Sequence, residues 1–119
     1  MRPVVMLAAA SAISHSDAAL ACDRDDIAIL QSNWRVDGEY VRVVGELKNS
    51  CSTETGIQLQ AIYRKSSGEI IHVTDFWPAS TNNVRAGESF GFSTLQRIAN
   101  QGVASVDVKV IAVQQWKPR

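Results

Sequence analysis

Apolar and polar residues alternate along most of the chain, the pattern of strands with one face buried and the other in water. The clearest case is residues 57–65, in which alternate residues share one apolar face: Ile57, Leu59, Ala61 and Tyr63. A second alternating face contains Val41, Val43, Gly45 and Leu47. Altogether the pattern predicts six strands, at residues 26–36, 41–48, 57–65, 69–77, 88–93 and 103–113.

The segments between these strands carry turn signals. Asp37-Gly38 lies between two alternating segments and predicts a hairpin. Residues 93–102 are expected to include one helical turn, with Ser93 or Thr94 capping its start and Gly102 its end. Six or so strands with at most one short helical turn predict a single all-β domain, either a sandwich or a small barrel.

The first 21 residues have the features of a signal peptide. Arg2 supplies a positive charge, residues 3–13 are apolar, and small residues precede a cleavage site after Ala21. The apolar run is too short to cross a bilayer. We therefore expect a signal peptide at 1–21 and one domain at 22–119, exported to the periplasm or secreted, and not transmembrane after processing.

The chain has two cysteines, Cys22 and Cys51, on either side of the predicted hairpin. In an oxidising compartment, two cysteines in a small exported domain most simply form one disulfide. Folding the chain at Asp37-Gly38 brings the two together, so a Cys22–Cys51 disulfide is predicted. The alternative is a lipoprotein acylated on Cys22, which is disfavoured because Ala19 stands where such sites carry Leu.

A series of spaced residues resembles the FxLYD-type domain, an immunoglobulin-like β-sandwich of exported bacterial and archaeal proteins. The matching positions are Val43, Gly45, Asn49, Ser50, Ile62, Tyr63, Gly68, Ile70, Ile71, Gly87, Glu88 and Phe92. The family's name-giving Phe and Asp are replaced by Gln60 and Arg64, and Ala86 stands where Pro is common. The resemblance implies a seven-stranded Greek-key sandwich that works as a binding or spacer module and has no catalytic motif.

The charge balance bears on the class of partner. Twelve basic and twelve acidic side chains cancel, and this removes the electrostatic signature of binding to nucleic acid or to an anionic membrane. A nucleic-acid partner is therefore not expected.

Catalytic and metal-binding residues are sparse. His72 is the one histidine of the predicted domain, and Asp75, three positions further along the same predicted strand, points to the opposite face. Two cysteines and one histidine do not have the spacing of a zinc cluster. We expect no metal and no cofactor, and a small hydrolase built around His72 is the weakest of the functional hypotheses.

The tryptophans are the remaining candidates. Trp34 is expected in or at the edge of the core, whereas Trp77 is expected to be exposed at the end of a strand. The next loop would then give a small polar and aromatic patch of Trp77, Asn82, Asn83 and Arg85. The sequence thus favours a non-catalytic module that binds a protein partner through a sheet edge or this loop. The alternative is binding to a carbohydrate or the cell wall through exposed aromatic rings.

Overall fold

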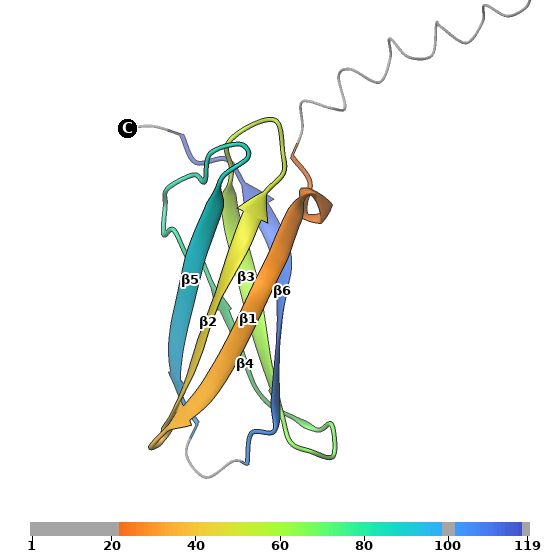
Figure 1. Ribbon diagram of the computed structural model, residues 1–119, viewed down its shortest axis with the longest axis vertical. Coiled ribbons are helices and arrows are strands. Elements are labelled where there is room, and N and C mark those ends of the chain that lie inside the picture. The colour runs from red at the N-terminus through yellow and green to blue at the C-terminus, as the bar shows by residue number, and fades with distance from the viewer. Residues whose placement is uncertain (1–21, 99–101, 118–119) are drawn as a thin grey trace, which may run out of the picture.

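The computed structural model describes residues 22–98 and 102–117, which form two facing antiparallel sheets (Figure 1). The elements are the 3-10 helix η2 (Arg24–Asp26) and the strands β1 (Ile27–Asp37), β2 (Tyr40–Asn49), β3 (Gly56–Arg64), β4 (Ile70–Phe76), β5 (Ser89–Arg97) and β6 (Ser105–Gln114). The all-β fold predicted from alternation is confirmed. The predicted signal peptide at 1–21 lies outside the described residues.

The strands are distributed between the sheets as in an immunoglobulin-like Greek key. The first sheet has the order β1-β2-β5 and the second the order β4-β3-β6. Each sheet therefore starts from a hairpin and is completed by a strand from later in the chain, which pairs with the central strand. The described residues contain six strands, at the lower end of the expected six to seven.

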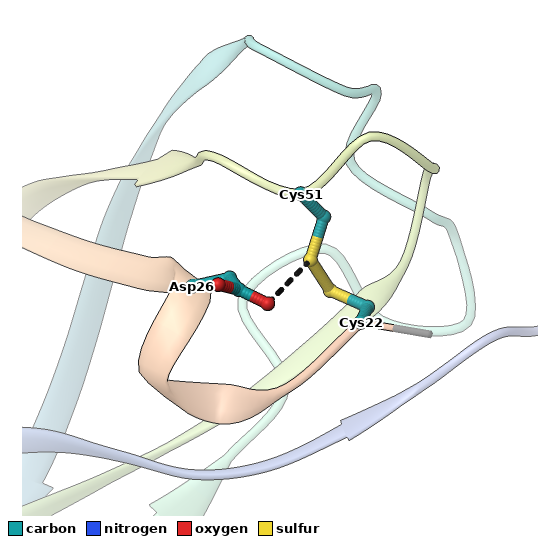
Figure 2. A group of neighbouring side chains, drawn as sticks. All are labelled: Cys22, Asp26 and Cys51. Atoms are coloured by element: carbon teal, nitrogen blue, oxygen red, sulfur yellow. Dashed lines mark hydrogen bonds between the residues drawn. A yellow bond between two sulfur atoms is a disulfide. The ribbon is translucent and has the colours of Figure 1, made fainter. Parts of the chain in front are cut away.

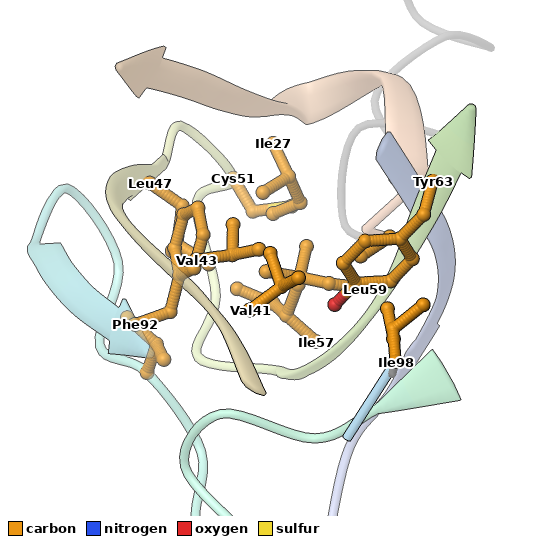
Figure 3. Close-up of a cluster of buried hydrophobic side chains, with 12 residues drawn as sticks. Ile27, Val41, Val43, Leu47, Cys51, Ile57, Leu59, Tyr63, Phe92 and Ile98 are labelled. Atoms are coloured by element: carbon orange, nitrogen blue, oxygen red, sulfur yellow. The ribbon is translucent and has the colours of Figure 1, made fainter. Parts of the chain in front are cut away.

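The predicted core faces are correct. Every alternate residue of β3 that was expected to face inward is at most 2% exposed, and Val41, Val43 and Leu47 of β2 are at most 1% exposed. Figure 3 shows these side chains meeting between the two sheets. The valines of β6 and Trp34 of β1 pack against this core but are only half-buried.

The first hairpin is tight. Asp37 pairs with Tyr40, which leaves Gly38 and Glu39 as the turn, one residue later than Asp37-Gly38. Gly38 has a φ of 64°, a left-handed conformation that glycine adopts without steric cost.

The helical turn expected within residues 93–102 is wrong for the part that the structure describes. Residues 93–97 belong to β5, where Thr94 pairs with Val43 of β2. The capping signals at Ser93 and Thr94 are overridden because the backbone of this segment pairs with the central strand of the first sheet. The helical turn found in the described residues is η2 at Arg24–Asp26, where Asp23 and Asp26 form a capping box.

The two ends of the sandwich hold different elements. The disulfide end, uppermost in Figure 1, holds η2, the loop from β2 to β3 and the loop from β4 to β5. The hairpin end holds the β1–β2 and β3–β4 turns, the end of β5 and the start of β6. Within the described residues, no helix has the length and apolarity needed to cross a membrane.

Candidate functional site

The predicted patch after β4 is organised around Trp116, a residue not included in it. The indole rings of Trp77 and Trp116 meet edge-to-face, with centroids 5.3 Å apart, and both residues are half-buried. Trp116 lies against Gly56, where a Cβ atom would collide with the indole. Trp77 is thus less exposed than the sequence suggested, because Trp116 covers part of it.

Asn83 holds the backbone of Trp116 in place. Its Oδ1 accepts a hydrogen bond from the backbone N–H of Trp116 at 2.9 Å, and its Nδ2 donates to the Trp116 carbonyl at 2.9 Å. Nδ2 also lies 3.2 Å from a carboxylate oxygen of Glu54. Because both ends of the amide are engaged, Asn83 acts as a clamp between the loop and the segment after β6.

The structure does not bring Asn82 and Arg85 into this cluster. Both are exposed, and their backbone groups, not their side chains, take part in the hydrogen bonds recorded for the loop. The four predicted residues therefore divide into two that pack on or clamp Trp116 and two that face solvent.

The loop itself is anchored by Asn49, which is fully buried at the end of β2. Its side-chain nitrogen donates to the carbonyls of Val84 at 2.9 Å, Thr53 at 3.1 Å and Arg85 at 3.3 Å. Its Oδ1 accepts from the backbone N–H of Cys51 at 2.9 Å. A buried amide with all these partners fixes two loops relative to each other.

The predicted disulfide is present, and it joins Cys22 to Cys51 with Cα atoms 5.5 Å apart. Figure 2 shows Asp26 beside it, with one carboxylate oxygen 3.7 Å from the Cys51 sulfur. The potential metal-ligand atoms of these three residues lie within 4.8 Å of one another. The two sulfurs are bonded to each other, however, and so provide no thiolate ligand.

His72 lies between the sheets at the side formed by β4 and β5. Its Nε2 is 3.3 Å from Oε1 of Gln96, and its ring meets that of Tyr63 edge-to-face with centroids 5.4 Å apart. Tyr63 is fully buried with no hydrogen-bond partner for its hydroxyl, and burial raises the pKa of Tyr63 to about 12. The phenol beside His72 thus keeps its proton at neutral pH and is not an activated nucleophile.

The edge at β6 is a feature that the strand pattern alone did not reveal. No described strand pairs with the outer side of β6. At the disulfide end, η2 and the start of β1 lie against β6, and β1 then runs away from it toward the hairpin end (Figure 1). The valines at 106, 108 and 110 on β6 are consequently only half-buried.

A groove lies on the outer face of the first sheet. It has a volume of about 350 Å³ and is lined by Asn33, Trp34, Arg35, Arg42 and Val44. Sequence reasoning missed it, although the hairpin carried the signal. Once the turn is placed at Gly38 and Glu39, counting outward puts Arg35 directly opposite Arg42.

Searches among protein families, curated proteins and solved structures found no match to this chain.

Proposed function

We propose that this chain is an exported, non-catalytic module that binds a protein partner, and that an extended segment of the partner adds to the free edge of β6. The single observation that carries the proposal is that edge. β6 is ten residues long and has no strand beyond it in the described residues. An unpaired edge presents a row of backbone donors and acceptors that another strand can satisfy.

The side chains next to the edge suit such an addition. Three residues of β6 face the core yet remain half-buried: Val106, Val108 and Val110. Val36, on the part of β1 that runs away from β6, is 58% exposed. A partner strand with alternating apolar residues would lay them against Val36 and the β6 valines and complete their burial. Backbone pairing would supply affinity, and these apolar contacts would select the sequence.

The other predicted surfaces suit binding less well. In the loop after Trp77, the side-chain amide of Asn83 is already hydrogen-bonded to the backbone of Trp116. Glycan binding needs an open indole face, whereas the Trp77 and Trp116 rings pack on each other. The hydrolase hypothesis relies on His72, whose recorded neighbours are Gln96 and the ring of Tyr63.

Export is part of the proposal, and the Cys22–Cys51 disulfide supports an oxidising compartment. The resemblance to FxLYD-type domains is in keeping with both export and a binding role. Intact mass measured on protein from the native host tests this. A chain that starts at Cys22 and takes up alkylating reagent only after reduction supports export as a free module. An acyl-sized increase in mass on Cys22 supports the lipoprotein alternative.

Photo-crosslinking in the native host tests the edge. A photoreactive amino acid replaces the exposed Lys109 on β6, and a matched control carries it at the exposed Lys48 on β2. We expect a discrete protein adduct from position 109 and none from position 48. Adding Val108→Lys should abolish the adduct, because an inward-pointing charge blocks pairing at an edge, while thermal unfolding verifies that the variant folds.

Two outcomes contradict the proposal. One is an adduct at position 48 with none at 109, and the other is an adduct at 109 that persists in folded Val108→Lys protein. If Val108→Lys does not fold, Val106→Lys at the start of the same strand replaces it.

A further inference from the structure

Two arginines face each other on the outer surface of the first sheet. Arg35 of β1 is directly opposite Arg42 of β2, and Arg42 is directly opposite Leu95 of β5. Side chains opposite each other on neighbouring strands have Cβ atoms roughly 4.5–5.5 Å apart, and like charges in that position are destabilising. The sheet thus holds a repulsive pair close to the β1–β2 turn.

Neither guanidinium is compensated within the described part of the chain, where no ion pair or side-chain hydrogen bond is recorded for Arg35 or Arg42. Asp37 is two residues from Arg35 on the same face, but it is opposite Tyr40 and forms no ion pair with either arginine.

The outer face of the second sheet is different. There Arg64 pairs with Asp107 at 3.4 Å, and Gln60 donates to Asp75 at 2.9 Å. Gln60 lies directly opposite Asp75, and Asp107 lies diagonally across from Arg64.

On the first sheet itself, Arg97 shares the face of Arg42 and is paired with Glu39. Among the arginines of the described strands, the lack of a partner is therefore specific to Arg35 and Arg42.

Apolar side chains surround the two arginines. Tyr40, Val44 and Leu95 share their face of the sheet and are 44%, 39% and 44% exposed. The groove of about 350 Å³ runs between Asn33 and Arg35 on one strand and Arg42 and Val44 on the next. It thus combines two free guanidinium groups, an amide and an apolar rim.

We infer that this groove binds an acidic segment of a protein, with a carboxylate held between Arg35 and Arg42 and a neighbouring apolar side chain on Val44 and Leu95. Arginine binds carboxylates with two parallel hydrogen bonds, and a carboxylate between the two guanidinium groups removes their repulsion. The amide of Asn33 offers one further donor. The chain's balanced charge of twelve basic and twelve acidic residues favours an acidic peptide over a nucleic acid.

The inference goes beyond the proposed function, since the groove and the edge of β6 belong to different sheets. A substitution that abolishes binding at the groove should leave the edge of β6 intact, and the reverse. The two proposals can therefore fail separately. Photo-crosslinking from position 109 on β6 tests the edge, and an NMR titration tests the groove.

NMR titration of ¹⁵N-labelled protein tests the groove. The probe is a blocked synthetic peptide of alternating glutamate and leucine, and the matched probe has glutamine in place of glutamate. We expect saturable shifts of backbone amides at 33–35 and 42–44 with the acidic probe alone. Arg42→Gln should weaken binding about tenfold, as expected for one lost charge-assisted hydrogen bond, whereas Arg24→Gln, an exposed change on η2, should not.

Thermal unfolding separates binding from a structural role. Because removal of one arginine relieves the repulsion, the melting temperature of Arg42→Gln without peptide should stay the same or rise. Equal binding of the glutamine probe, no saturable shift with the acidic probe, or unchanged binding by Arg35→Gln/Arg42→Gln would each overturn the inference. An oligonucleotide that shifts the same amides as strongly as the peptide would also overturn it, and would assign the groove to nucleic acid.

Discussion

The disulfide end and the hairpin end of the sandwich are closed by different means. At the disulfide end a covalent bond joins Cys22 to Cys51, buried Asn49 bonds to two loops, and Asn83 clamps Trp116. At the hairpin end an exposed ion pair, with 2.8 Å between Arg97 Nη2 and Glu39 Oε1, joins the end of β5 to the β1–β2 turn. The β4–β5 loop of residues 77–88 is thus held by the polar side chains of Asn49 and Asn83, whereas the β1–β2 turn at Gly38 and Glu39 needs little beyond its own backbone geometry.

The hairpin end also contains a fully buried tyrosine, Tyr63, whose hydroxyl makes no hydrogen bond within the described part of the chain. Tyr63 lies there beside Ile98, as Figure 3 shows, and its hydroxyl has no partner. The backbone N–H of Ile98 instead donates to the carbonyl of Glu39 at 2.8 Å. The buried amide of Asn49 at the disulfide end is therefore fully bonded, whereas the buried hydroxyl of Tyr63 at the hairpin end has no partner. The buried indole nitrogen of Trp116 at the disulfide end also has no partner among the described residues. Changes of the same kind at the two ends should have different effects.

The largest effect is expected from removing the disulfide. Cys22→Ser/Cys51→Ser should lower the free energy of unfolding by roughly 3–4 kcal/mol, because the bond closes a loop of 29 residues in the unfolded chain. Urea unfolding without reductant measures this. Reductant added to the unmodified protein should reproduce the loss and leave the double variant unchanged. Equal urea midpoints for the reduced and oxidised protein would contradict the prediction.

Asn49→Ala should have the next largest effect, a loss of roughly 3 kcal/mol. It leaves the Cys51 N–H without the Asn49 acceptor, and it removes the side-chain bonds to the carbonyls of Thr53, Val84 and Arg85, of which the last two keep only their backbone partners. The matched control is Asn82→Ala, an exposed amide in the β4–β5 loop, with an expected change within about 0.5 kcal/mol. Urea unfolding of both variants checks the difference. A similar stability for the two variants would show that Asn49 does not anchor the loops.

Tyr63 should give the opposite result at the hairpin end. Tyr63→Phe should leave stability at pH 7 unchanged or raise it by about 1 kcal/mol, since it removes a buried hydroxyl without a partner. Stability measured by urea unfolding at pH 7 checks this. A clear loss would mean that the hydroxyl makes a stabilising contact.

The raised pKa of Tyr63 predicts a loss of stability in alkali. The pKa is about 12 in the folded protein and 10.0 as the ordinary value, so between these pH values the unfolded chain has lost the phenol proton while the folded chain keeps it. Stability is therefore fully present below pH 10 and falls as the pH rises. Relative to Tyr63→Phe, the protein should lose about 1 kcal/mol from pH 9 to pH 11. Parallel curves for the two proteins would contradict this.

The smallest effect is expected for the surface pair of the hairpin end. Glu39→Gln should cost less than about 1 kcal/mol, because Arg97 and Glu39 have side chains 66% and 57% exposed and water screens their attraction. Added salt should shrink even this difference. A loss as large as that of Asn49→Ala would remove the contrast between the two ends.

Alternation predicted the parts of the fold that depend on one strand at a time. The inward faces of β2 and β3 follow from their sequence because each strand buries one face fully. The disulfide could be predicted from the hairpin. Cys22 and Cys51 lie at similar sequence distances on either side of a turn near residue 38, so the hairpin brings them together. The extent of β5 did not follow, because Thr94 and Gln96 are held in a strand by pairing with β2 and not by their own preference.

The candidate sites were less predictable because they depend on contacts between strands and not on the sequence of one strand. The approach of Trp77 to Trp116 joins positions on either side of two further strands, and neither the spacing nor the residue types indicate it. The pairing of Arg35 with Arg42 depends only on the register of one hairpin. Contacts within a hairpin can thus be counted from the turn, whereas contacts between hairpins require the three-dimensional structure.

The strand order has a consequence for how the chain folds. β2 and β3 are the central strands, and each receives its second neighbour, β5 or β6, from a distant part of the chain. Until those strands arrive, both central strands have one unpaired side, and slow folding with a high contact order prolongs that period. Chaperones that hold the chain before its last strands are in place should therefore recognise β2 and β3.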